Sequence, residues 1–169
     1  VGVYTDEFLV IDISSPTAPV LEERPTESFS GASFRWAYQY DDYVYLLDSG
    51  SGVWVVDLSS PLAPTVVNRL QLPMTLGCLY GRGSTLYLCA EEKYFHFADV
   101  SEPLEPVLAY SGDLVAGSFL YTSIVVYNNH VYGREEHFPD GGTYDGRFGV
   151  FDVTDPYNPE WTPINLAAD

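Results

Sequence analysis

The sequence contains almost no positive charge. Its 169 residues include 7 Lys and Arg against 24 Asp and Glu, so the formal net charge is −17, and Lys93 is the only lysine. A field of this sign repels the phosphate backbone. The composition therefore argues against nucleic acid as a partner and favours an acidic surface that keeps the protein soluble or collects cations.

Long apolar runs are also missing. No stretch approaches the roughly 20 apolar residues that a membrane-spanning helix needs, and no basic segment followed by an apolar one opens the chain. We therefore expect no membrane span. Because Val1 is not a start methionine, we also expect a processed or excised piece of something longer.

Cysteine is scarce, and its spacing leaves two interpretations open. Cys78 and Cys89 flank a turn signal at residues 81–84. If this turn closes a hairpin, the two thiols can form a disulfide in an oxidising compartment. A one-residue slip in register would place them on opposite faces as two buried free thiols. A zinc site is not supported, because the cysteines and histidines lack zinc-ligand spacing.

The residues that are abundant favour strands. Hydrophobic residues make up 46% of the chain and aromatic residues 15%, with 14 Gly and 12 Pro to supply turns. Val, Tyr, Phe and Trp fit a pleated, half-buried surface. We therefore expect one folded all-β domain over residues 1–169.

One phrase occurs four times: an apolar run, Asp, an aliphatic residue, Ser or Thr, any residue, Pro, two residues, Pro. Eight of the 12 prolines fall in this frame, and the Asp residues are spaced by 45, 42 and 53 positions. This period fits one four-stranded propeller blade. We interpret the Asp as a structural turn residue that bonds to nearby amides, followed by prolines that end the strand. The four aspartates are Asp12, Asp57, Asp99 and Asp152.

A hairpin precedes three of the copies. Residues 41–42 and 128–129 are two-residue polar turns between alternating apolar segments, and residues 81–84 form the third turn. Each blade then has strands a, b, c and d in chain order. We expect a partial blade one over about residues 1–24, without its innermost strand, and complete blades two, three and four over about 34–70, 76–110 and 120–164.

The repeated phrase, with its Leu9–Asp12 and Ser14–Pro16 segments, resembles the LVIVD repeat family of β-propeller proteins. The resemblance implies a secreted or cell-surface propeller and does not imply a chemistry. A closed propeller needs four to eight blades. We therefore expect a larger ring, completed by another segment or by association into a homo-oligomer.

Acidic residues collect in the predicted b-to-c turns, residues 5–7, 48–52, 91–93 and 134–147. Hard cations take several carboxylate oxygens, so a Ca²⁺ site is one prediction. The fourth turn is the longest, and its candidate ligands are Glu135, Glu136, His137, Asp140 and Asp145. The alternative is a solvated hairpin tip built from turn-forming Asp and Gly.

No catalytic motif occurs: the chain lacks G-x-S-x-G and any G-x-G-x-x-G that opens a helix. This favours a secreted or cell-surface scaffold that binds a protein or glycan ligand through its rim loops. No cofactor is predicted beyond the candidate Ca²⁺. Two alternatives stay open. One is a metal-dependent enzyme with Asp48, Glu91, Glu135 and Asp145 around the cation, and the other is a structural subunit of a surface layer or filament.

Overall fold

The structure, a computed structural model, describes residues 11–21, 29, 32–50, 52–72, 74–90, 94–113, 119–137 and 145–164. These residues form strands and turns, and none of them belongs to a helix. No segment of the described part meets the length and hydropathy of a membrane-spanning helix.

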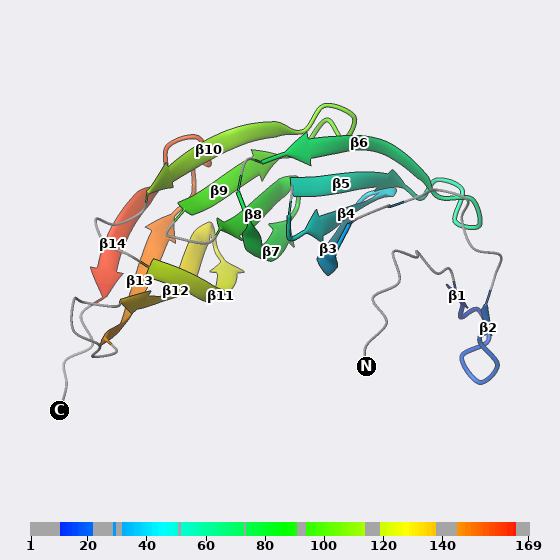
Figure 1. The fold of residues 1–169 in the computed structure, drawn as a ribbon, viewed down its shortest axis with the longest axis horizontal. Helices are drawn as coiled ribbons and strands as arrows, with labels where there is room; N and C mark the ends of the chain where they lie inside the picture. Colours follow the sequence, from blue (N-terminus) through cyan, green and yellow to red (C-terminus); the bar gives the residue numbers. More distant parts are fainter. Residues whose placement is uncertain are drawn as a thin grey trace.

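The strands form four antiparallel sheets in which chain neighbours pair (Figure 1). Within residues 11–21, the described part of the first sheet, the strands are β1 (Ile11–Asp12) and β2 (Val20–Leu21). Each of the other three has four strands. Blade two comprises β3 (Phe34–Tyr40), β4 (Tyr43–Asp48), β5 (Gly52–Asp57) and β6 (Thr65–Gln71). Blade three comprises β7 (Leu76–Arg82), β8 (Thr85–Ala90), β9 (Tyr94–Asp99) and β10 (Val107–Asp113). Blade four comprises β11 (Phe119–Tyr127), β12 (His130–His137), β13 (Asp145–Asp152) and β14 (Glu160–Ile164).

The three complete sheets follow one another along an arc (Figure 1). The a strands are neighbours across blades, since β3 contacts β7 and β7 contacts β11. The predicted all-β propeller of four-stranded blades is therefore confirmed, and the described residues of the first blade form two strands. In Figure 1 the two-stranded sheet β1–β2 lies apart from the other three.

The cores lie between successive blades. Tyr45 and Val55 of blade two pack against Leu86 and Leu88 of blade three, and all four are essentially inaccessible to solvent. Burying such side chains stabilises the fold by about 1.5–3 kcal/mol each. Apolar packing therefore holds neighbouring blades face to face, and backbone hydrogen bonds hold the strands together within each sheet.

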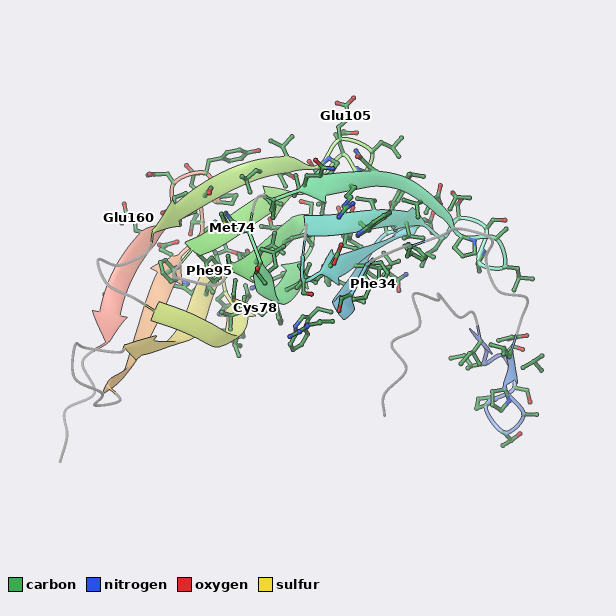
Figure 2. The ribbon with its side chains drawn as sticks, viewed as in Figure 1. Phe34, Met74, Cys78, Phe95, Glu105 and Glu160 are labelled. Atoms are coloured by element: carbon green, nitrogen blue, oxygen red, sulfur yellow. A yellow bond between two sulfur atoms is a disulfide. The ribbon has the colours of Figure 1, made fainter. Side chains whose placement is uncertain are left out.

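The core between blades three and four is largely aromatic. Tyr87, Phe95 and Phe97 pack there, and Phe95 stacks on Phe151 of blade four with ring centroids 5.8 Å apart. The two cysteines belong to the same cluster, and Cys78 and Phe95 are labelled in Figure 2.

Cys78 and Cys89 are bonded through their sulfur atoms. They lie directly opposite each other on β7 and β8, with their Cα atoms 5.0 Å apart. A bulge between Leu76 and Cys78 sets this register. Both residues are buried against blade four, so the bond links the a and b strands of blade three at an interface between blades.

A close contact between a strands joins blades two and three. The ring of Tyr38 on β3 lies against Gly81 on β7, where a Cβ would overlap it. The Tyr38 hydroxyl donates to the Gly83 carbonyl at 3.0 Å, and Trp36 Nε1 donates to the Gly77 carbonyl at 3.1 Å. Gly81 therefore leaves space for the Tyr38 ring, whose position is fixed by the hydrogen bond of its hydroxyl group.

Gly81→Ala is expected to lower the free energy of unfolding by about 2 kcal/mol, because overpacking a fixed contact costs about 1–3 kcal/mol. Chemical denaturation measures the loss. Gly77→Ala is the matched control on the same strand, since its Cβ would meet only the Cys89 carbonyl oxygen at 3.8 Å. Equal losses in the two variants would contradict the account.

Candidate functional site

The loops that join strands c and d repeat one set of hydrogen bonds. In each of the four copies the Asp carboxylate accepts from the amide two residues later, at 2.7–2.9 Å. The donors are the amides of Ser14, Ser59, Ser101 and Thr154. These are Asx turns, in which a side chain substitutes for a backbone acceptor.

A proline turn follows each Asx turn. The residue before the first proline accepts from the amide three residues later, and proline suits the second position of such a turn because its φ is already fixed. The amide–carbonyl pairs are Ala18–Ser15, Ala63–Ser60, Glu105–Glu102 and Asn158–Asp155, at 2.8–3.1 Å.

The same loops are bonded to the turns between strands a and b. The amides of Leu58, Val100 and Val153 donate to the carbonyls of Asp42, Ser84 and Asn129, respectively, at 2.7–2.8 Å. The a–b turns and c–d loops of each complete blade therefore share one rim, called here the c–d rim. Its backbone is held in the same way in three successive blades.

One exposed apolar side chain stands at the same place in each complete blade. The residue after the first proline is Leu62, Leu104 or Tyr157, and these are 62%, 55% and 54% exposed. Nearby carboxylates include Glu105, which projects from the outer edge of the sheets in Figure 2. The c–d rim thus presents apolar groups at blade spacing among acids.

Two hydrogen bonds tie this rim across blades. The Asn68 side-chain amide donates to the Leu104 carbonyl, and the Tyr157 hydroxyl donates to an Asp99 carboxylate oxygen at 3.2 Å. Each bond joins a c–d loop to the preceding blade, so the relative positions of the exposed apolar groups are constrained.

A shallow acidic hollow of about 220 Å³ lies at the blade-four end of the rim. Its walls are Asp152, Thr154, Asp155, Asn158 and Glu160. Charge and hydrogen-bond acceptors dominate this surface, which suits a cationic or hydrogen-bond-donating group of a ligand.

The Asx turns lower the pKa of their carboxyls. The Ser14 and Ser59 hydrogen bonds lower the pKa of Asp12 and Asp57, and those from Thr154 lower the pKa of Asp152. Burial raises the pKa of Asp99, but hydrogen bonds from Ser101 and Tyr157 outweigh it and the net shift is downward. The ionised carboxylates therefore stabilise the folded rim.

Acid is expected to weaken the fold through these groups. A pKa lowered by folding gives stability that is fully present above the unfolded value of about 3.9 and is lost as the pH falls through the folded pKa. The variant Asp57→Asn/Asp99→Asn/Asp152→Asn keeps a side-chain carbonyl to accept each amide. Between pH 7 and pH 3 its melting temperature should fall less than that of the wild type, and parallel curves would rule out this role.

On the opposite rim, where strands b and c are joined, Asp48 is buried. The residue is 3% exposed, and its Oδ1 accepts from the amides of Ser33 and Gly50 at 3.2 Å. Its Oδ2 accepts from Trp54 Nε1 at 3.3 Å and pairs with Arg69 Nη2 at 3.2 Å. The Arg69 guanidinium also lies over the Trp54 ring, 4.4 Å from its centroid. Asp48 therefore organises its turn and is not an open ligand of the rim.

The fourth b-to-c turn is shorter than the sequence predicts. Residues 134–147 were expected to form a long loop, yet β12 extends to His137 and β13 begins at Asp145. The register pairs Glu135 with Arg147, Glu136 with Gly146 and His137 with Asp145. The hairpin is longer than predicted because the strand pairing continues through these polar residues.

The calcium candidates stay a prediction. Asp140 and Glu91 lie outside the described residues, and only the backbone of Glu135, Glu136, His137 and Asp145 is described. Within the described part, no three His, Cys, Asp or Glu side chains are grouped as metal ligands. If the site exists, Ca²⁺ should raise the melting temperature by several degrees over chelator at matched ionic strength, and Asp140→Asn/Asp145→Asn should abolish that rise.

His96 is a packed strand residue. It is 1% exposed, its Nε2 lies 2.7 Å from Met74 Sδ, and burial lowers its pKa. His130 lies at the blade-four hairpin, where its Nδ1 is 2.6 Å from the Asn128 carbonyl oxygen. The His96 contact joins β9 to the segment between β6 and β7, and the His130 contact lies within its own turn, so packing and turn formation account for both.

Comparison with known proteins finds matches to the repeated phrase and to the fold. The family model for the LVIVD repeat matches residues 1–26 and 39–71, which confirms the resemblance drawn from the repeated phrase. A search of curated proteins finds no match.

Solved propeller structures are similar in fold at low sequence identity. The N-terminal domain of Nup159 is 10% identical with a TM-score of 0.58, and the match covers 96% of this chain and 46% of that domain. A structure of S. cerevisiae Dbp5 bound to Nup159, Gle1, IP6 and ADP gives a TM-score of 0.59 at 10% identity, with 96% and 46% coverage. A europium-containing methanol dehydrogenase gives 0.56 at 11% identity, with 85% and 29% coverage. The chain therefore spans less than half the length of these structures.

Proposed function

Since this chain carries LVIVD repeats folded as propeller blades, we propose that it is a secreted or cell-surface scaffold that binds a protein ligand on its c–d rim. The observation that carries the proposal is the apolar group repeated at blade spacing, Leu62, Leu104 and Tyr157, each more than half exposed. Single exposed apolar residues are ordinary on protein surfaces. Three at the same turn position, on a backbone held alike in each blade, form a regular surface.

Charge indicates the kind of ligand. The chain carries a net charge of −17, and the rim holds Glu102, Glu105 and Asp155 beside the exposed apolar groups. Complementary charge raises the rate of encounter and selects the partner. The ligand is accordingly an extended segment in which Lys or Arg alternate with apolar residues.

The disulfide supports the location. Both cysteines of the chain are in the bond between β7 and β8. Disulfides persist in secreted and surface proteins and are rare in reducing compartments. A highly acidic surface also keeps such a protein soluble and limits self-association.

A phage-displayed random peptide library tests the proposal. Peptides selected on the wild-type chain are counter-selected on the variant Leu62→Ser/Leu104→Ser/Tyr157→Ser, whose changes lie at exposed positions. We expect enriched basic and apolar sequences whose affinity for the variant is at least tenfold lower and falls with salt. Enrichment of sequences that bind both proteins equally would reject the c–d rim as the binding surface.

A further inference from the structure

The innermost strands of the three complete blades carry no acid. β3, β7 and β11 contain none of the 24 Asp and Glu residues of the chain, whose net charge is −17. These strands lie along the concave side of the arc (Figure 1), and the surface formed by β3 and β7 is called here the inner wall. Neighbouring blades pack through the faces of their sheets, so the inner wall faces the central channel of a propeller whatever its number of blades.

Trp36 is an exposed aromatic residue on the inner wall. Its side chain is 48% exposed, and its Nε1 donates to the Gly77 carbonyl of β7 at 3.1 Å. The indole therefore spans the two inner strands, and its one donor group is already in a hydrogen bond. A ring held in this way loses little conformational freedom when a ligand stacks on it.

Tyr80 is a second exposed ring on the inner wall. By register it occupies in blade three the position that Tyr38 occupies in blade two. The Tyr38 ring lies against Gly81 of the next blade, whereas the residue at the matching position of blade four is Val126. Val126 has a side chain where Gly81 has none, and Tyr80 is 37% exposed while Tyr38 is half-buried. One glycine difference between blades thus accompanies the exposure of the Tyr80 ring.

Two arginines flank the rings. Arg35 on β3 and Arg82 on β7 are both exposed, in a chain with only 7 Lys and Arg. Tyr40 and Arg82 are the last residues before their turns, and Arg35 lies five positions before Tyr40. The two arginines are therefore about 16 Å apart along the strand direction. This spacing suits an elongated ligand that carries negative groups at intervals.

The sign of the ligand charge follows from the surroundings of Arg35. The described acid nearest to it in register is Asp48, which is already paired with Arg69 at 3.2 Å. At physiological ionic strength, exposed charges more than about 8 Å away are largely screened. The guanidinium of Arg35, and not the net charge of the chain, therefore determines which charge this end of the inner wall selects.

The combination of side chains indicates the class of ligand. Exposed Trp and Tyr rings are rigid, amphipathic surfaces, against which the C–H face of a sugar ring can pack. The guanidinium group binds a carboxylate through two parallel hydrogen bonds. Uronic acids carry both features, a sugar ring and a carboxylate, in every unit.

We propose that the inner wall binds an acidic oligosaccharide built from uronic acids. Its sugar rings stack on Trp36 and Tyr80, and its carboxylates pair with Arg35 and Arg82. The inference goes beyond the proposed function, because it concerns a second surface and a ligand of opposite charge to the one assigned to the c–d rim.

Isothermal titration calorimetry at physiological ionic strength tests the ligand class with three probes. Hexagalacturonate has both sugar rings and carboxylates, maltohexaose has the same number of rings without carboxylates, and hexaglutamate has carboxylates without sugar rings. Hexagalacturonate should bind, and each of the other two probes should bind at least tenfold more weakly. Absence of hexagalacturonate binding, or equal binding of either comparison probe, would overturn the proposal.

Variants with an unchanged circular dichroism spectrum test the surface. Trp36→Ala and Arg35→Gln should each weaken hexagalacturonate binding at least tenfold, because Trp and Arg contribute most at binding surfaces. Trp36→Phe keeps a ring and should stay within about threefold of the wild type, which separates stacking from a loss of fold. Tyr157→Ala is the matched aromatic control, 54% exposed on the c–d rim, and should bind as the wild type does. An unchanged affinity in Trp36→Ala, or a loss in Tyr157→Ala equal to that in Trp36→Ala, would reject the inner wall as the site.

Discussion

Asp48→Ala is expected to lower the free energy of unfolding by about 3 kcal/mol. Removing one partner of a buried ion pair costs about 3–5 kcal/mol, and the lower end applies because the Arg69 side chain is 28% exposed. The change also removes the acceptor for the amides of Ser33 and Gly50. Urea denaturation followed by Trp fluorescence measures the loss, and Trp54 reports directly on this cluster.

Three further variants sharpen the test. Asp42→Ala changes an exposed acid of the same blade and should stay within about 0.5 kcal/mol of the wild type. Asp48→Asn keeps an oxygen acceptor for the two amides and should fall between the wild type and Asp48→Ala. The double variant Asp48→Ala/Arg69→Ala should lose less than the sum of its single changes, because the pair is coupled. An Asp48→Ala variant as stable as Asp42→Ala would refute the structural role of the cluster.

Removal of the disulfide is expected to cost about 3 kcal/mol. The bond closes a short loop, since Cys78 and Cys89 have a sequence separation of 11, and a loop of that size restricts the unfolded chain by about this amount. The variant Cys78→Ala/Cys89→Ala removes the bond and leaves small apolar side chains in the core between blades three and four. Its urea midpoint compared with that of the oxidised wild type gives the difference.

Reductant is the internal control for this prediction. Reducing the wild type under denaturing conditions and refolding it with reductant should bring its midpoint close to that of the double variant. The double variant itself should not respond to reductant. Identical midpoints for oxidised and reduced wild type would show that the bond does not contribute to stability.

Much of the fold could be predicted because its signals are local. The polar pairs at 41–42 and 128–129 interrupt apolar alternation, and positive φ angles of 53° at Asp41, 47° at Asn128 and 58° at Asn129 accompany these turns. Asp and Asn adopt this conformation at low cost. The repeated phrase likewise contains the Asp and Pro residues that build each c–d loop.

The site was harder to predict because its determinants are tertiary. Asp48 was grouped with the acids of the b-to-c rim, whereas its partner Arg69 lies 21 positions away on β6, and no local pattern links them. The pairing of Cys78 with Cys89 depends on a bulge at Leu76–Cys78, which apolar alternation does not specify. The extension of β12 to His137 was missed because polar residues at a strand end resemble a loop.

The order of the strands has a consequence for how the chain folds. Within each complete sheet every strand pairs with its neighbour in the sequence, so most pairing requires only short loops to close, and such local contacts favour rapid folding. Contacts between blades, such as Tyr38 with Gly83, form over longer separations. A nascent chain can therefore complete one blade as it emerges and use that blade as the surface on which the next one forms.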